Sequence, residues 1–416
     1  MTTPPSRLGL AVCALLGLPA TAPAADASWE IDTATLYYGE SGRVSLLEPM
    51  IAARRRWDDD RSLGLKLTLD TLTGPSPNGA TPAGSAQTIS GPSGNGAATT
   101  APGEIPLDDQ FRDTRVALAV DYAAPLLGAW TAAYGLNASN EYDYLSLGGS
   151  LRLQRDFNQR NTTLALGLAY ASDRLEPVGG VPQPLSVKDA SAKEDGSTDS
   201  KSVTDLLLGI TQIIDPVSLV RVNLVLSQSS GYLNDPYKIL SVLDAEGEPL
   251  RYLYEGRPDR RLKSGLFAEY LRDIDGDTLR GSYRYQTDDW GVDSHTVELA
   301  YRLPFAGRQY IEPQLRYYQQ TAADFYRVAL DEAESEGLQA ATADYRLGGM
   351  SSVTIGAQYG YRLRSGSELS LRLGYYLQTP DQGPLPAQAA EGLSRFGELV
   401  PETTAVMATV GYRFSW

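Results

Sequence analysis

The chain ends in the stretch Thr404 to Trp416, which reads T-A-V-M-A-T-V-G-Y-R-F-S-W and decides the fold class. Successive side chains of a β-strand point to opposite faces. One face would carry Trp416, Phe414, Tyr412, Val410, Ala408 and Val406, and the other Ser415, Arg413, Gly411, Thr409 and Met407. We therefore expect a strand with an apolar and aromatic face opposite a polar one.

Such a strand is typical of a bacterial outer-membrane barrel, in which one face meets lipid and the other a polar interior. In such barrels the last strand, which ends in an aromatic residue, carries the signal that the outer-membrane assembly machinery recognises. The same pattern also fits the last strand of a soluble β-sandwich, so the remainder of the chain has to separate the two.

The beginning of the chain predicts export. Arg7 precedes the apolar run from Leu8 to Leu18, and Ala22-Pro23-Ala24 supplies the small residues of a cleavage site. Residues 1–24 are thus interpreted as a signal peptide and residues 25–416 as one outer-membrane domain. Cys13, the only cysteine, follows Val12 inside the signal, so we expect no lipid anchor, disulfide or thiolate site.

Composition narrows the choice further. The formal charge of -15 argues against nucleic-acid binding, because phosphates require a basic footprint. The 25 tyrosines, against 7 Phe and 5 Trp, suit the aromatic girdles at the two lipid interfaces of a barrel.

Alternating segments of about ten residues recur along the mature chain, and we count about 16 of them. The clearest are Ser367 to Gln378, Val353 to Arg364, Leu145 to Gln154, Thr163 to Tyr170, Thr114 to Tyr122, Ala129 to Asn137 and Leu219 to Ser227. Trp29 to Tyr38, Val44 to Trp57 and Val203 to Ile214 alternate more weakly.

The connections between these segments are alternately short and long. The longer ones are Thr73 to Gln110, Ser172 to Ser202, Gln228 to Asp259, Thr321 to Leu347 and Thr379 to Glu402. With both termini periplasmic, every long connection points outward, as in outer-membrane barrels. The predicted fold is an all-β transmembrane antiparallel up-and-down β-barrel of about 16 strands, with short periplasmic turns and long extracellular loops.

Three loop segments have a distinct composition. Thr73 to Pro106 is rich in Gly, Pro, Ser, Ala and Thr, which predicts a flexible surface loop. Ala322 to Gln339 and Pro386 to Gly397 have helical composition and are predicted as short helices over the barrel mouth.

The alternation also assigns charged side chains to the lumen. The pore-lining candidates on the later strands are Arg284, Arg302, Arg316, Arg362, Arg372, Arg413, Glu269, Glu298, Glu312 and Glu368, and the first strands add Glu30, Asp32, Asp70 and Asp121. These charges either line a water-filled path, with the arginines favouring anions, or form a neutralised ion-pair network that rigidifies or plugs the barrel.

His295 is the only histidine and lies beside Ser294, near Asp288, Asp289 and Asp293. A serine, a histidine and an acid could form a hydrolase site. Adjacent strand residues diverge, however, and His295 shares its face with lipid-facing Val297, so we expect a rim histidine and no enzyme. The aspartates could bind calcium, although such loop clusters are usually only solvated. Phosphate-loop, zinc-helix, haem and dinucleotide motifs are missing from the sequence, and we expect no cofactor.

Several strings in order resemble one family. They are Asp70 to Ala80 (D-T-L-T-G-P-S-P-N-G-A), Asn161 to Thr163, Gly231 to Lys238 (G-Y-L-N-D-P-Y-K), Tyr254 to Pro258 (Y-E-G-R-P), Asp288 to Gly291 (D-D-W-G) and Ala322 to Tyr326 (A-A-D-F-Y). Together they resemble a family of exported bacterial proteins catalogued as domain of unknown function 3570.

The resemblance implies an outer-membrane barrel. It also implies genomic neighbours that include a small lipoprotein, a thioredoxin-like protein and a flavin transferase, and hence an envelope redox system. No catalytic residue is established for the family. The leading hypothesis is a passive channel for small hydrophilic or anionic solutes. The alternative is a non-conducting barrel that acts as a scaffold or docking partner for redox proteins such as the lipoprotein or thioredoxin-like neighbour.

Overall fold

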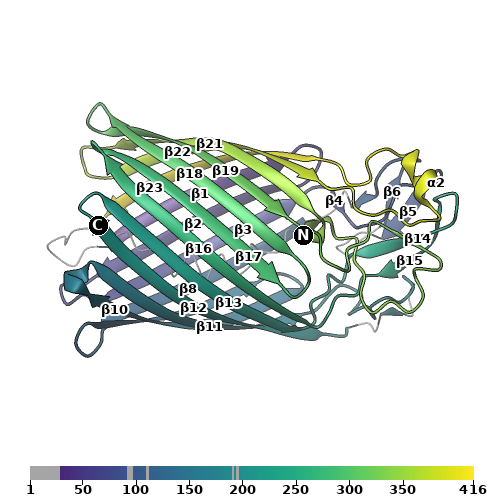
Figure 1. The fold of residues 1–416 in the computed structure, drawn as a ribbon, viewed down its shortest axis with the longest axis horizontal. Helices are drawn as coiled ribbons and strands as arrows, with labels where there is room; N and C mark the ends of the chain where they lie inside the picture. Colours follow the sequence, from purple (N-terminus) through teal and green to yellow (C-terminus); the bar gives the residue numbers. More distant parts are fainter. Residues whose placement is uncertain (1–28, 91–96, 109–111, 190–191, 194–195) are drawn as a thin grey trace.

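In the computed structural model the described residues are 29–416, apart from 91–96, 109–111, 190–191 and 194–195. The predicted signal peptide and Cys13 lie outside them. Sixteen long strands of this described part close into one antiparallel barrel (Figure 1). In barrel order they are β1 (Trp29–Glu40), β2 (Ser45–Arg56), β3 (Ser62–Thr73), β8 (Arg112–Pro125), β9 (Trp130–Asn140), β10 (Tyr144–Phe157), β11 (Thr162–Leu175), β12 (Asp199–Asp215), β13 (Ser218–Gly231), β16 (Arg260–Ile274), β17 (Asp277–Asp288), β18 (Asp293–Phe305), β19 (Gln309–Gln320), β21 (Met350–Arg362), β22 (Glu368–Pro380) and β23 (Thr403–Ser415). The predicted strand number and up-and-down order are confirmed.

The final strand closes the barrel against the first. Strand β23 pairs with β1 from Glu30 opposite Ser415 to Glu40 opposite Ala405. The backbone N–H of Trp29 donates to the carbonyl of Trp416 at 2.7 Å, and that of Trp416 donates to the carbonyl of Trp29 at 2.8 Å. Closure satisfies the backbone groups of both strands, which could not stay unpaired in a membrane.

The alternation observed in the sequence produces an apolar outer surface. Large apolar side chains are exposed along the outside of every part of the wall, for example Leu147, Leu168, Leu224, Leu299, Ile355 and Leu373. An exposed apolar band of this extent is stable only against lipid. The part of the chain that is described holds no helix with the length and apolarity to cross a membrane.

Exposed aromatic side chains mark the two edges of this band. Near the strand ends that adjoin the chain terminus lie Trp130, Phe305, Tyr359, Tyr412 and Trp416, and near the opposite ends lie Tyr37, Tyr170, Tyr283, Tyr317 and Tyr375. Two rings of amphipathic side chains are the arrangement expected at the two membrane interfaces.

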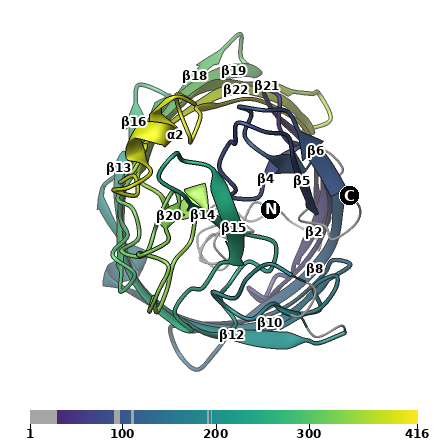
Figure 2. The same cartoon turned by 90° about the vertical axis from the view of Figure 1, so that its right-hand side faces the viewer.

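The long connections fold together at one end of the barrel into a lid. It contains the sheet β15–β14–β20, the pairs β4–β7 and β5–β6, and a short helix (Figures 1 and 2). The bounds are β4 (Ser76–Pro77), β5 (Gln87–Ser90), β6 (Ala97–Thr100), β7 (Leu107–Asp108), β14 (Ile239–Leu243), β15 (Pro249–Tyr254), β20 (Leu330–Asp331) and α2 (Ala390–Ser394). Seen along the barrel, these elements lie over its mouth (Figure 2).

Two sequence predictions about the loops are wrong. The described parts of Thr73 to Pro106 are not a flexible surface loop, because Ala80, Ala83 and Ile89 are buried in the lid. Low complexity favours flexibility only where no partner is available, and here the other outer loops supply one. Ala322 to Gln339 contains turns and β20 instead of a helix, because Leu330 and Asp331 pair with Val242 and Leu243 of β14. Pro386 to Gly397 does contain the predicted short helix, α2.

Candidate functional site

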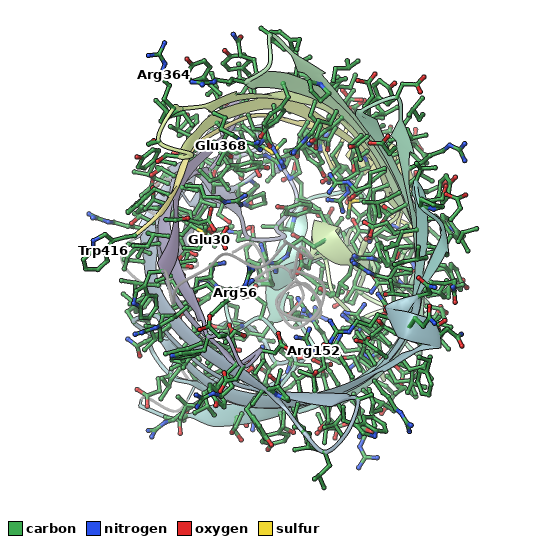
Figure 3. All side chains as sticks on the ribbon, turned by 90° about the vertical axis from the view of Figure 1, so that its left-hand side faces the viewer. Glu30, Arg56, Arg152, Arg364, Glu368 and Trp416 are labelled. Carbon is green, nitrogen blue, oxygen red and sulfur yellow. The ribbon has the colours of Figure 1, made fainter. Side chains whose placement is uncertain are left out.

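The predicted pore-lining residues lie on the inner face of the wall, and most of them form ion pairs. We call the end of the barrel opposite the lid, where Trp416 lies (Figure 1), the terminal end. Seen from this end, Glu30 and Glu368 lie inside the wall, whereas Trp416 lies outside it (Figure 3). The ion pairs are Arg302 with Glu312 (2.6 Å), Arg316 with Glu298 (3.4 Å), Arg362 with Glu368 (3.9 Å), Arg413 with Asp32 (2.5 Å) and Glu30 (3.8 Å), and Arg221 with Glu269 (3.3 Å).

The remaining candidates and first-strand acids have other neighbours. Arg372 donates to the amide oxygen of Gln358 at 2.6 Å, and Arg284 lies over the ring of Phe267 with 5.4 Å to its centroid. Asp70 is ion-paired with Arg115, and the Asp121 carboxylate lies against Gly64. The structure therefore contains the ion-pair network that the sequence left as one of two alternatives.

Side chains of the lumen wall differ in their exposure to solvent. At the terminal end, the lumen side chains of Arg362 and Arg413 are 68% and 54% exposed, and Arg316 midway is 51% exposed. At the opposite end, Ser146 and Asp173 are each 1% exposed. Solvent thus reaches several charged side chains of the lumen wall at the terminal end and midway, although Tyr310 and Glu312 near the same end are buried, and the lid lies over the opposite mouth (Figure 2).

A buried cluster of six charges ties the lid loops together, and we call it the latch. Its members are Asp235, Lys238, Glu255, Arg257, Asp344 and Arg346, three acids and three bases. Arg346 forms ion pairs with Asp344 (2.5 Å) and Asp235 (2.9 Å). Arg257 contacts Glu255 at 2.8 Å and Asp344 at 2.8 Å. These pairs join the loop between β13 and β16 to the loop between β19 and β21.

A third loop is attached to the same cluster. The Lys238 ammonium donates to the carbonyl of Pro77, and the Ile239 N–H donates to the carbonyl of Asn78 at 2.9 Å. The Thr342 hydroxyl donates to Glu255 at 2.5 Å. Every loop that meets at the latch is therefore held by at least one charged partner.

Burial and pairing act against each other on the latch pKa values. Burial opposes ionisation of Asp344, but Arg346 and Arg257 outweigh it and hold the pKa of Asp344 well below its usual range. Burial lowers the pKa of Lys238, an effect that Asp344 partly offsets. Burial raises the pKa of Glu255 despite the nearby Arg257. The cluster is stable as a set of opposite charges and intolerant of losing one member.

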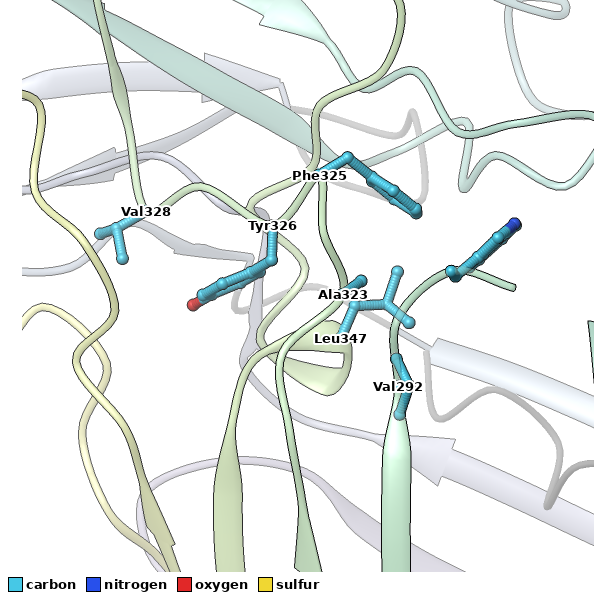
Figure 4. Packing of buried hydrophobic residues seen from close by; sticks show 7 residues of the cluster. Val292, Ala323, Phe325, Tyr326, Val328 and Leu347 are labelled. Carbon is cyan, nitrogen blue, oxygen red and sulfur yellow. The ribbon is translucent and has the colours of Figure 1, made fainter. Parts of the chain in front are cut away.

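An apolar cluster packs beside the latch. Trp290, Val292, Ala323, Phe325, Tyr326, Val328 and Leu347 are all buried in it (Figure 4). The rings of Trp290 and Phe325 meet edge to face, with 5.1 Å between centroids, and the Asp324 N–H donates to the Trp290 carbonyl at 2.9 Å. This packing fixes the short outer turn between β17 and β18 against the lid.

His295 does not form a catalytic arrangement with Ser294. Ser294 is buried on the inner side, whereas His295 is exposed on the outer side, where its Nδ1 is 2.8 Å from the Tyr283 hydroxyl. The neighbouring aspartates have separate partners. Asp288 pairs with Arg261 (2.5 Å), Asp289 accepts from the Leu262 N–H (2.9 Å) and Asp293 accepts from Tyr285 (3.1 Å). Within the described residues, His, Cys, Asp and Glu form no group of three or more suited to a metal.

The sequence did not single out the latch as charged chemistry, although four of its members lie in two of the strings quoted above. Asp235 and Lys238 belong to Gly231 to Lys238, and Glu255 and Arg257 to Tyr254 to Pro258. The strings Asp288 to Gly291 and Ala322 to Tyr326 meet through Trp290 and Phe325. The feature of the sequence that could have indicated the latch is the occurrence of these distinctive strings in the outer loops, which the structure brings together in the lid.

The fold defines the class of protein: an outer-membrane β-barrel whose covered mouth carries a folded lid. The chain belongs to the family described as a protein of unknown function, DUF3570, whose model matches residues 6–414. A search of curated proteins gives no match.

Solved structures with a similar fold are outer-membrane barrels. The siderophore receptor PirA from Acinetobacter baumannii is 9% identical with a TM-score of 0.43, and the match covers 86% of this chain and 54% of the receptor, so the chain spans about half of that length. OccK2 (OpdF) from Pseudomonas aeruginosa is also 9% identical with a TM-score of 0.41, over 94% of this chain and 98% of the other. OpdK from Pseudomonas aeruginosa is 11% identical with a TM-score of 0.39, over 94% and 99%.

Proposed function

We propose that this protein is an outer-membrane transport barrel for small hydrophilic solutes, in which the lid gates the outer mouth. One observation carries the proposal: the lumen wall carries solvent-exposed charged side chains, such as Arg316, Arg362 and Arg413, and a lid with its own buried clusters lies over the opposite mouth (Figure 2). A lumen of this kind suits a hydrated solute, because charged and polar walls replace part of its hydration shell.

The arginines do not by themselves give the lumen a positive field. Arg302, Arg316, Arg362 and Arg413 each face a carboxylate. Pairing of this kind leaves little net charge for a passing ion to sense. The proposed cargo is therefore hydrophilic without a strong preference for anions.

Single-channel recording in a planar bilayer tests the proposal. The wild-type barrel should open rarely, and a variant with a loosened lid, Arg346→Ala, should open often and with weak ion selectivity. Arg395→Ala, which removes an ion pair to Glu248 on the lid surface, is the matched control and should behave like the wild type.

The closed lid also favours a second candidate, a barrel that never conducts and serves as a docking scaffold for envelope proteins. A loosened lid that still gives no current from a correctly folded barrel would support this second candidate and contradict transport. We further infer that His295 takes no part in catalysis or transport, because it lies on the lipid side of the wall, so His295→Ala should leave transport unchanged.

A further inference from the structure

Three tyrosines on the lumen wall share one arrangement just below the lid. Tyr38 donates to Glu40 at 2.8 Å, Tyr318 to Gln320 at 2.5 Å and Tyr376 to Gln378 at 2.7 Å. Each acceptor lies two positions further along the same strand, toward the lid. All three tyrosines are on the inner face and only partly buried, so the part of each side chain that stays exposed faces the lumen.

These tyrosines belong to one part of the wall, because a single strand separates β19 from β22 and another separates β22 from β1. Strand β21 joins β19 to β22, and Thr354 pairs with both Arg316 and Tyr376. Ala405 of β23 pairs with both Tyr376 and Glu40. Five adjacent strands, from β19 to β1, thus form a continuous wall roughly 19 Å wide, given the usual spacing between strands.

An accessible ion pair lies at the edge of this wall, between Arg316 of β19 and Glu298 of the adjoining β18. Arg316 and Glu298 are paired at 3.4 Å and are each 51% exposed, so a solute can reach both groups. Gly356 of β21 pairs with Gly374 of β22, and neither adds a side chain to the wall, although the Met407 side chain of β23 lies against Gly374. A solute that fits must present an apolar ring face to the tyrosines and hydroxyl groups to the guanidinium and the carboxylate.

We propose that this tyrosine wall is a binding site for a neutral, ring-shaped polyhydroxylated solute, that is, a sugar or short oligosaccharide. Sugars have both required surfaces: C–H faces that pack on aromatic rings and hydroxyls that both donate and accept hydrogen bonds. The balanced Arg316–Glu298 pair disfavours a carboxylate solute, because Glu298 would repel it. This inference rests on the proposed function and names the class of solute transported.

The wall is also connected to the lid. The Gln320 amide accepts from Tyr318 and donates to the carbonyl oxygens of Arg346 (3.1 Å) and Gly348 (2.7 Å). A solute that moves Tyr318 therefore disturbs the backbone that carries the latch arginine. Binding at the wall and opening of the lid share one hydrogen-bonded chain.

Calorimetric titration of the purified barrel in detergent tests the site without relying on conductance. Maltotriose and sucrose are the probes and benzoate is the charged comparison. Tyr318→Ala and Tyr376→Ala should each weaken sugar binding by about tenfold, since a lost aromatic contact accounts for roughly that much. Tyr317→Ala and Tyr375→Ala are matched controls, because these neighbours point to the lipid, and they should bind sugar like the wild type.

The results separate this inference from the transport proposal. Sugar binding that falls only in the two lumen variants supports the site. A barrel that conducts but binds neither sugar overturns the site and leaves transport standing. Tighter binding of benzoate than of sugar, or equal losses in lumen and lipid-facing variants, also overturns it. Sugar binding by a silent barrel contradicts passive transport alone.

Discussion

Replacing Arg346 by alanine should open the lid without unfolding the barrel. Arg346 is the counter-charge of two buried acids, at 2.5 Å from Asp344 and 2.9 Å from Asp235, and its side chain is 15% exposed. Truncating one partner of a buried charge pair typically costs about 3–5 kcal/mol, because the remaining charge stays buried without compensation. If all of that cost acts on the closed lid, it raises the population of the open lid by roughly two to four orders of magnitude.

Hydrogen exchange measures this effect locally. Amides bonded across the lid, such as Ile239 to Asn78 and Gly256 to Ala341, should exchange a hundredfold or more faster in the variant, by the same estimate. Amides inside the barrel strands should not change. Arg346→Lys should fall between the two, because an ammonium keeps the charge and loses the forked contact with Asp344.

Arg395→Ala provides the comparison that decides the matter. Arg395 and Glu248 also form an ion pair in the lid, but their side chains are 45% and 33% exposed. Exposed pairs contribute about 0–1 kcal/mol, so exchange should accelerate at most about fivefold. The reasoning is refuted when Arg346→Ala and Arg395→Ala accelerate lid exchange equally, or when barrel amides accelerate along with the lid.

Three further perturbations should have local and measurable effects. Burial and the nearby Asp113 raise the pKa of Glu141 to about 8 from its ordinary 4.5. The free energy of unfolding of the wild type should therefore fall by up to a few kcal/mol as the pH rises from 4.5 to 8. Glu141→Gln should flatten this pH dependence in thermal melts. Gly291→Ala should destabilise the lid by about 1–3 kcal/mol, because Gly291 has a φ of +83° and an added Cβ would overlap the Asp324 carboxylate; limited proteolysis of the lid measures this, and protection equal to the wild type contradicts it. Gln320→Ala should uncouple the tyrosine wall from the lid, so that maltotriose no longer changes channel opening while titration still detects its binding.

The barrel could be predicted from the sequence because its physics is local and repeated. In a strand such as Ser367 to Gln378, the alternation of apolar and polar residues identifies the outer and the inner face. The described barrel contains sixteen strands. The inward direction of Arg316 and Glu298 follows from the same alternation. Their pairing does not, because it depends on the register between β18 and β19, which places the two residues opposite each other.

The lid could not be predicted in this way because its contacts join distant loops. Lys238 contacts Pro77, and Arg257 contacts Asp344, over separations of 161 and 87 residues. Nothing in Thr73 to Pro106 marks it as a segment that packs, since Ala80 and Ile89 are core residues through their packing with Ile239 and Tyr254 of another loop. The composition of this segment indicated flexibility, but its contacts with another loop bury it in the lid.

The latch chemistry suits the opening of the lid that we propose. Opening an apolar core exposes apolar surface to water, and no favourable hydration offsets that free-energy cost. Opening a charged cluster returns each ion to solvent, and the regained hydration of the ions offsets part of the cost. Three acids and three bases are balanced, so the closed state carries little net charge at neutral pH, and the free-energy gap to an open lid is smaller than an apolar cluster of the same size would give. The apolar packing around Trp290 and Phe325 includes Leu347, the residue next to Arg346, so the cluster and the latch both hold the loop between β19 and β21.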